Sequence, residues 1–200
     1  MQFNGTFELE GASTEEVWLA LSDPYMVKHA LPGCQFLLEV EGEEADWEEL
    51  RERAAAAGED PETLPDADPE DVAARAFEEG GRYAALMELS VGSVSPSFET
   101  VVTITEREYP VMNATGEGSA ANSSFEMDSG MTLSETDDGV AVEWWTEADV
   151  FGRIAQMGQR VLNPVANRVV NRFFGNIEDE LQGISDEDSG GLRNRIKDMF

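Results

Sequence analysis

The chain has 200 residues, which suits one domain with a hydrophobic core or one domain with appendages. Its 42 acidic residues outnumber 13 basic ones, and the resulting net charge of -29 excludes an electrostatic binder of nucleic acid. Hydrophobic residues make up 41% of the chain, so the charge does not indicate disorder.

The acidic residues are spread along the chain, and lysine occurs only at Lys28 and Lys197. In near-molar salt the Debye length falls to about 3 Å, so carboxylates barely repel one another and their hydration keeps the surface soluble. We therefore interpret the composition as halophilic, that is, adapted to a salt-rich cytoplasm. An acidic decoy for a basic partner is the alternative interpretation.

The single cysteine excludes an internal disulfide. The first ten residues, MQFNGTFELE, lack the basic start and the continuous apolar stretch of a signal peptide. No apolar run reaches the roughly 18 residues of a membrane span. We expect a cytoplasmic protein, with peripheral contact at the inner face of the cell membrane as an option.

The first 40 residues predict a strand, two short helices and a second strand. Apolar residues alternate with polar ones over residues 3–9, the pattern of a half-buried strand. Residues 13–16 (STEE) are a capping box in front of a short helix, and a second helix over about 24–30 follows an Asp-Pro pair. A strand is expected over about 34–40.

Residues 41–81 interrupt the β pattern with two acidic helical segments around a Pro-rich linker. We interpret this block as an insertion in a hairpin. A lid or a docking surface would give it a function, and a solvated decoration is the interpretation that we favour.

The β pattern then resumes in five alternating segments: 82–92, 97–108, 111–119, 123–135 and 139–150. A long amphipathic helix is expected over about 152–182, with Pro164 bending it. Such a curved antiparallel sheet needs its concave face covered, and the terminal helix is the only element long enough to cover it. The fold class is therefore α+β, with about seven strands wrapped on a long C-terminal helix.

Residues 183–191 are typical of a flexible linker. Residues 192–200 depart from the acidic composition of the rest of the chain. On a helix, the apolar and basic residues of this tail form a membrane or partner contact: Leu192, Arg193, Arg195, Ile196, Lys197, Met199 and Phe200. A helix folded back on its own acidic domain is the other interpretation, and both stay open.

The order of elements and four motifs resemble one known family. LSDPYMVKHALPGC resembles the "L-x-D-P … L-P-G-C" signature of CoxG, the family of a carbon monoxide dehydrogenase subunit, and LSVGSVSPSFETVVTITE resembles its "VG-x-x-x-x-x-F" strand pair. ATGEGSAANSSFEMDSGMTLSE is similar to its Gly-rich hairpin, and DVFGRIAQMGQRVL to its "G-x-x-A-x-x-G-x-R" helix start. The resemblance covers about 1–182 apart from the insertion.

This resemblance implies the helix-grip fold of the START-like (SRPBCC, polyketide-cyclase) superfamily, which holds an apolar molecule between helix and sheet. It also implies an accessory, membrane-recruiting role beside a carbon monoxide dehydrogenase-type molybdenum hydroxylase and the handling of a quinone or lipid. It implies no cofactor and no metal of the chain's own.

His29 and Cys34, the only residues of their kinds, could form a nucleophile pair. A helix end and a Pro-Gly turn separate them and fix no geometry between them. One His and one Cys would leave only carboxylates to complete a metal site. We interpret the pair as a mark of the fold and predict no catalytic residue.

Several methionines and Trp144 lie on predicted inward faces, where flexible thioethers suit either ordinary core packing or an adaptable apolar cavity. With the resemblance, we expect a cavity lined by Met87, Phe98, Val102, Met127, Met131, Trp144, Met157, Val161 and Val165. The predicted function is non-catalytic binding of a quinone or lipid-like ligand. A polyketide-cyclase-like enzyme on the same fold and a ligand-free assembly factor are the alternatives.

Overall fold

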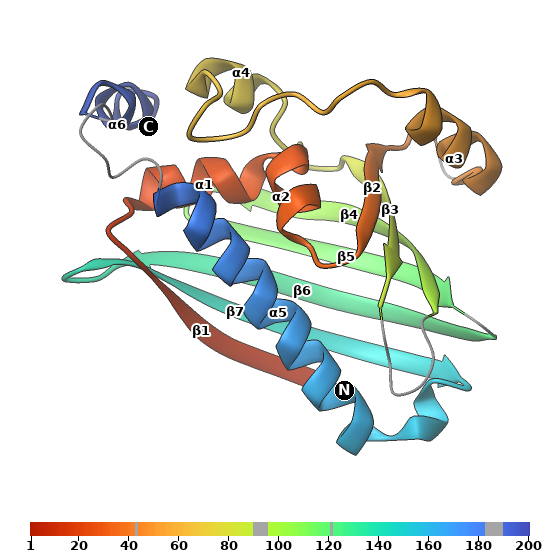
Figure 1. Cartoon of the computed structure of the whole chain (residues 1–200). Helices are drawn as coiled ribbons and strands as arrows, with labels where there is room; N and C mark the ends of the chain where they lie inside the picture. The colour runs from red at the N-terminus through yellow and green to blue at the C-terminus, as the bar shows by residue number, and fades with distance from the viewer. Residues whose placement is uncertain (43, 90–95, 121, 183–189) are drawn as a thin grey trace.

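Seven strands form one curved antiparallel sheet in the part of the chain that the computed structural model describes (Figure 1). The described residues are 1–42, 44–89, 96–120, 122–182 and 190–200. The strands are β1 (Gln2–Glu10), β2 (Cys34–Glu39), β3 (Arg82–Glu88), β4 (Ser97–Glu108), β5 (Val111–Ala120), β6 (Ser123–Glu135) and β7 (Gly139–Gly152). Their spatial order is β1-β7-β6-β5-β4-β3-β2, so the first and last strands of the chain pair with each other.

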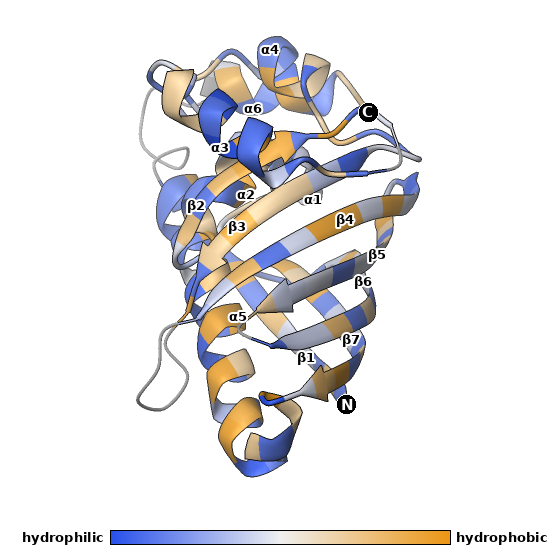
Figure 2. Ribbon diagram, turned by 90° about the vertical axis from the view of Figure 1, so that its right-hand side faces the viewer, coloured by the Kyte–Doolittle hydropathy of each residue, from blue (hydrophilic) through white to orange (hydrophobic). Residues whose placement is uncertain are grey.

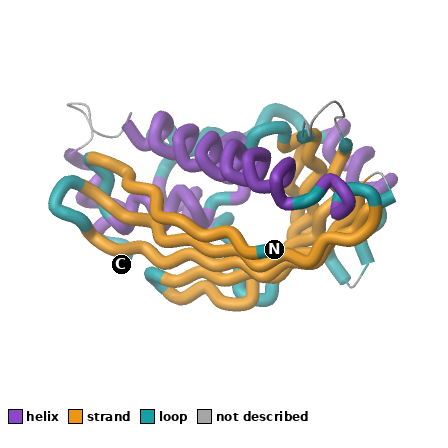
Figure 3. The backbone as a smooth tube through the Cα atoms, turned by 90° about the horizontal axis from the view of Figure 1, so that it is seen from below, coloured by secondary structure: helices purple, strands orange, loops and turns teal. Residues whose placement is uncertain are grey.

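Helices cover the concave face of this sheet, and one more lies beside its β2 edge (Figures 1 and 3). They are α1 (Thr14–Ser22), α2 (Pro24–Ala30), α3 (Trp47–Ala56), α4 (Pro69–Ala74), η1 (Ala155–Met157, one turn of 3-10 helix), α5 (Gln159–Gln182) and α6 (Gly190–Lys197). The long helix α5 crosses the concave face. The predicted α+β fold with a seven-stranded sheet and a C-terminal helix is confirmed.

The two short N-terminal helices begin where their capping residues predict. The amide of Glu16 donates to Ser13 Oγ at 3.2 Å and the amide of Ser13 donates to Glu16 Oε2 at 2.7 Å, a complete capping box. Asp23 accepts a hydrogen bond of 3.1 Å from the amide of Tyr25, and Pro24 occupies the first turn of α2.

Helix α5 begins later than its sequence pattern predicts. β7 continues to Gly152, the 3-10 turn follows, and Gly158 takes a left-handed φ of 74° before the helix begins at Gln159. The expected start near residue 152 is therefore wrong. The turn between strand and helix consumes the residues that the apolar spacing had assigned to the first helical turns.

The C-terminal half of α5 is seated on the sheet, whereas its N-terminal half is not. Phe174, Ile177 and Leu181 are buried, and the ring of Phe174 stacks on Phe7 of β1 with centroids 5.2 Å apart. Among the described residues of α5, none before Phe174 is fully buried. Helix α5 is therefore anchored to the core only at its C-terminal end. Apolar and polar residues follow one another along α5, as they do along β4 (Figure 2).

Residues 41–81, the segment that we interpret as an insertion, contribute to the core, so the interpretation of this segment as a solvated decoration is wrong. Leu64, Val72 and Phe77 pack in the same hydrophobic cluster as Trp18 of α1. On the opposite face of the sheet, Leu50 of α3 packs against a second cluster. The burial of these few apolar side chains outweighs the acidic average of the segment.

An ion pair ties the insertion to the turn between α1 and α2. Asp23 is fully buried and receives hydrogen bonds from Arg75 Nε at 3.0 Å and Arg75 Nη2 at 2.7 Å. The guanidinium of Arg75 also lies over the ring of Tyr25, 5.0 Å from its centroid. A bidentate contact of this kind fixes position as well as charge.

The C-terminal helix α6 lies on its own domain, the second of the two interpretations left open by the sequence. Ile196 is fully buried, and Leu192 packs against the main core cluster. Arg193 Nε lies 2.8 Å from Oε1 of the buried Glu16, and Arg195 pairs with Asp68 at 2.7 Å. Residues 183–189 of the predicted linker lie outside the described residues. None of the helices in the described ranges combines the length and the apolarity needed to cross a membrane.

Candidate ligand-binding pocket

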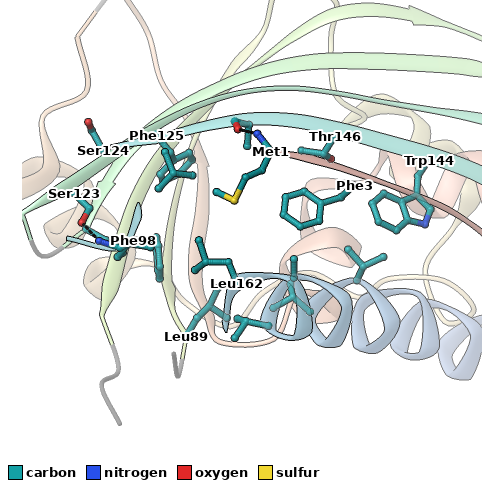
Figure 4. Close-up of a pocket in the computed structure, with 18 residues that line it drawn as sticks. Met1, Phe3, Leu89, Phe98, Ser123, Ser124, Phe125, Trp144, Thr146 and Leu162 are labelled. Carbon is teal, nitrogen blue, oxygen red and sulfur yellow. Dashed lines mark hydrogen bonds between the residues drawn. The ribbon is translucent and has the colours of Figure 1, made fainter. Parts of the chain in front are cut away.

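An apolar pocket of about 290 Å³ lies between the N-terminal half of α5 and the concave face of the sheet (Figure 4). The strands contribute Phe3, Phe98, Phe125, Trp144, Thr146, Ala148 and Val150, and α5 contributes Leu162, Val165, Ala166, Val169 and Val170. Its place follows from the packing of α5, because the half of the helix without fully buried residues is the half above the pocket.

Two glycines of β5 lie beneath large side chains of β6. A Cβ on Gly116 would come within 2.5 Å of Met127 Cε, and a Cβ on Gly118 within 2.7 Å of Phe125 Cζ. The side chains of Phe125 and Met127 on β6 therefore lie across the glycines of the neighbouring strand. Phe125 borders the pocket, so the missing Cβ at Gly118 leaves room for a ring of its wall.

Three of the nine residues predicted to line the cavity do so: Phe98, Trp144 and Val165. The other six lie outside its lining: Met87, Val102, Met127, Met131, Met157 and Val161.

Five of these six residues have identifiable places elsewhere, and the structure offers no such account for Met87. Val102 and Met131 pack against the main core cluster instead. Met157 belongs to the 3-10 turn that precedes α5, and Val161 to the first turn of the helix. Met127 lies over Gly116, as described above.

The lining includes residues that the sequence prediction missed. The place of Phe3 in the lining could have been predicted from the alternation of β1, since Phe3 pairs with Thr146 on the same face of the sheet. Leu162, Ala166 and Val169 follow from the helical spacing once the start of α5 is placed at Gln159. Both signals were present in the sequence.

No lining side chain among the described residues carries a charge, and the polar groups are few. Ser123 Oγ accepts a hydrogen bond of 2.9 Å from the amide of Ile154, and the α-amino group of Met1 donates to the carbonyl of Ala148. Thr146 adds a hydroxyl near the centre of the wall. The lining side chains favour an uncharged, mainly hydrocarbon molecule, because none of those described could pair with a buried charge, and the α-amino group of Met1 already donates to Ala148.

The His29–Cys34 pair lies apart from this pocket, and the two side chains have different partners. His29 Nε2 lies 3.0 Å from Asp60 Oδ2, and Lys28 bonds the same oxygen. Cys34 Sγ donates to the carbonyl of Phe36 at 3.3 Å, and burial raises the pKa of the thiol to about 11. At neutral pH this thiol is protonated and a poor nucleophile. In the described ranges, no three His, Cys, Asp or Glu side chains gather as metal ligands would.

The protein-family model of CoxG, a subunit of carbon monoxide dehydrogenase, matches residues 74–182. This range holds the strand pair, the Gly-rich hairpin and the helix start whose motifs carried the resemblance, and all of α5. The LPGC motif lies before it. No curated protein matches the sequence.

Solved structures with the same fold cover nearly the whole chain. A conserved protein from Geobacillus kaustophilus has a TM-score of 0.67 at 21% identity and covers 92% of this chain and 97% of its own. The Zhui aromatase/cyclase from a Streptomyces species has a TM-score of 0.58 at 11% identity, covering 95% and 98%. A protein from Thermus thermophilus has a TM-score of 0.58 at 10% identity, covering 93% and 100%. At these identities the likeness shows the fold alone.

Proposed function

The chain belongs to the CoxG family of carbon monoxide dehydrogenase subunits, whose model matches more than half of it, and from this membership we propose that it is a non-catalytic carrier of an apolar molecule. The ligand is a quinone or a lipid-like molecule held between α5 and the sheet. The protein acts as an accessory subunit of a molybdenum hydroxylase of the carbon monoxide dehydrogenase type and helps to bring it to the membrane.

The observation that carries this proposal is the pocket of about 290 Å³ under the partly seated helix, whose described lining side chains are all uncharged. A CH₂ group takes about the volume of a water molecule, roughly 30 Å³, so the space suits an aliphatic segment of about ten carbons. At about 0.8 kcal/mol per buried CH₂, the gross gain is about 8 kcal/mol. Ordering costs reduce this gain, so a Kd of about 1 µM is the tightest expected for a ten-carbon probe.

A cyclase-like enzyme on the same fold is the competing function, and the aromatase/cyclase named above has this fold. Such chemistry needs acids and bases that converge on the substrate. The described lining of the pocket offers hydroxyls and an indole but no carboxylate, imidazole or thiol. Binding is therefore the better-supported function. A ligand-free assembly factor would not need this empty volume.

The membrane or partner contact that the sequence predicted for residues 192–200 would require α6 to leave α1. In the docked position Ile196 is buried, whereas Phe200 is 54% exposed and Lys197 is also exposed. Deleting 190–200 and measuring co-sedimentation with vesicles tests this part of the proposal. Unchanged sedimentation would remove the tail from the membrane-recruiting role.

The ligand part is tested by organic extraction of freshly purified protein, followed by mass spectrometry, and by thermal unfolding with a mono-prenylated naphthoquinone. A ligand at a hundred times its Kd adds about 2.7 kcal/mol, which raises Tm by roughly 5–10 °C for a chain of this size. No extractable apolar molecule and no shift with the quinone would refute the carrier function.

The partner part needs a separate measurement. An affinity-tagged copy of the chain, purified from its native host, is expected to bring molybdenum with it. Elution of the tagged chain without molybdenum, from cells shown to contain an active hydroxylase, would contradict the accessory role.

A further inference from the structure

One stretch of the chain departs sharply from the acidic composition. Residues 150–177 contain no Asp or Glu and four arginines, in a protein whose net charge is -29. They cover the end of β7, the 3-10 turn and most of α5. Because acidic residues are spread through the rest of the described fold, this charge reversal marks a distinct surface.

Three of these arginines form a stripe on the outer side of α5, which we call the arginine face: Arg160, Arg168 and Arg172. Their spacings of eight and four residues place them within about a third of the helix circumference. All three are exposed, as are Asn163, Asn167 and Asn171 between them. In the described part of the chain, none of the three arginines forms an ion pair.

The inner side of the same helical segment is the wall of the pocket. Leu162, Val165, Ala166 and Val169 line the apolar space, while the arginine face points to solvent. One helix therefore separates the proposed ligand from whatever contacts the arginines. In Figure 1, α5 lies in front of the sheet as an outermost element of that side of the molecule.

We propose that the arginine face docks the protein on an anionic phospholipid bilayer, with α5 lying along the surface. Guanidinium groups offer forked donors that match phosphate oxygens, and they keep this hydrogen bonding where salt screens long-range attraction. A bilayer is also the reservoir of a water-insoluble ligand, so contact through the pocket's own wall places exchange beside the source. This step extends the proposed function, and it assigns the contact to α5 and not to α6.

The test is co-sedimentation of the full chain with vesicles of phosphatidylcholine alone or with about a third phosphatidylglycerol, in about 0.5 M KCl. The variant is Arg168→Gln/Arg172→Gln. The control is Arg51→Gln/Arg53→Gln, which removes the same charge from the exposed helix α3. Because two of the three guanidinium contacts with lipid phosphate are removed, the variant is expected to lose roughly tenfold or more in affinity.

The expected pattern is binding that needs phosphatidylglycerol, weakens with added KCl, survives the control and the deletion of 190–200, and is lost in Arg168→Gln/Arg172→Gln. Equal binding by variant and control, or loss of binding on deleting the tail, would overturn the inference. A dimer in solution that only the Arg168→Gln/Arg172→Gln variant dissociates would also overturn it, because the arginines would then contact a second copy.

Binding of the prenylated naphthoquinone, measured on the same variants by thermal shift, separates this inference from the proposed function. Quinone binding without arginine-dependent sedimentation would refute the docking surface and leave the carrier function standing. Arginine-dependent sedimentation without quinone binding would refute the carrier function and leave the docking surface standing.

Discussion

Replacing Arg75 by alanine should destabilise the protein strongly although the residue lies in the acidic insertion. Asp23 is 0% exposed, and the change removes its bidentate contacts of 3.0 and 2.7 Å. Of the described hydrogen bonds to the carboxylate, the one from the Tyr25 amide at 3.1 Å would remain. Removing one partner of a buried pair costs about 3–5 kcal/mol. Because the Arg75 side chain is 21% exposed, we expect the lower end, about 3 kcal/mol.

The assay is urea unfolding followed by circular dichroism, with thermal unfolding as a second readout. A loss of about 3 kcal/mol lowers Tm by roughly 6–12 °C for a protein of this size. Arg53→Ala on the exposed side of α3 is the control and should change stability by less than about 0.5 kcal/mol. Arg75→Met combined with Asp23→Asn should recover part of the loss, since no buried charge is then left unpaired. A loss below about 1 kcal/mol in Arg75→Ala would refute the integral role of the insertion.

Three further outcomes follow from particular contacts. Burial raises the pKa of Cys34 from 9.0 to about 11, so near pH 8 the thiol of the folded protein should react with iodoacetamide about a hundredfold more slowly than the thiol of the unfolded chain. The rate of the folded protein should rise as the pH approaches 11. Equal rates for the folded and unfolded chains would contradict the burial of this thiol. Gly118→Ala sets a Cβ 2.4 Å from the Glu99 carbonyl oxygen and should cost about 1–3 kcal/mol. Gly116→Ala meets only atoms of the flexible Met127 side chain, Cε at 2.5 Å and Cγ at 3.1 Å being the nearest, and should cost less; the reverse order in urea would be inconsistent with these contacts. With a charge of -29, Tm should rise by several degrees between about 0.1 and 2 M KCl, and a fall would count against a salt-adapted protein.

Most of the fold was predictable because its signals are local. Strand alternation depends only on side-chain parity, and the caps at Ser13 and Asp23 depend on residues within three positions. The start of α5 was not predictable in this way. Apolar residues at Ile154 and Met157 continue the helical spacing backwards, but the left-handed Gly158 separates them from the helix.

The pocket lining was only partly predictable because parity tells which face a residue occupies and not whether space lies above it. Trp144 and Met131 sit opposite each other on the concave face, yet only Trp144 borders the pocket. The difference depends on where α5 diverges from the sheet. That position is set by long-range packing at Phe174, for which a single sequence gives no local signal.

For residues 41–81, the average composition led to a wrong prediction of solvent exposure. The segment averages as acidic and solvated, but Leu64 and Val72 are each fully buried in the core cluster. A few apolar residues in an acidic segment are enough to anchor it.

Native mass spectrometry of freshly purified protein, comparing the unaltered chain with Ala166→Trp and Asn167→Trp, tests the apolar space under α5 most directly. Ala166 lines the pocket and Asn167 is exposed on the outer side of the same turn, so the two variants add the same indole in opposite directions. We predict a bound apolar mass on the unaltered chain and on Asn167→Trp, and its loss on Ala166→Trp. Bare protein in all three samples, or a bound mass that Ala166→Trp retains, would contradict a ligand held beneath this helix.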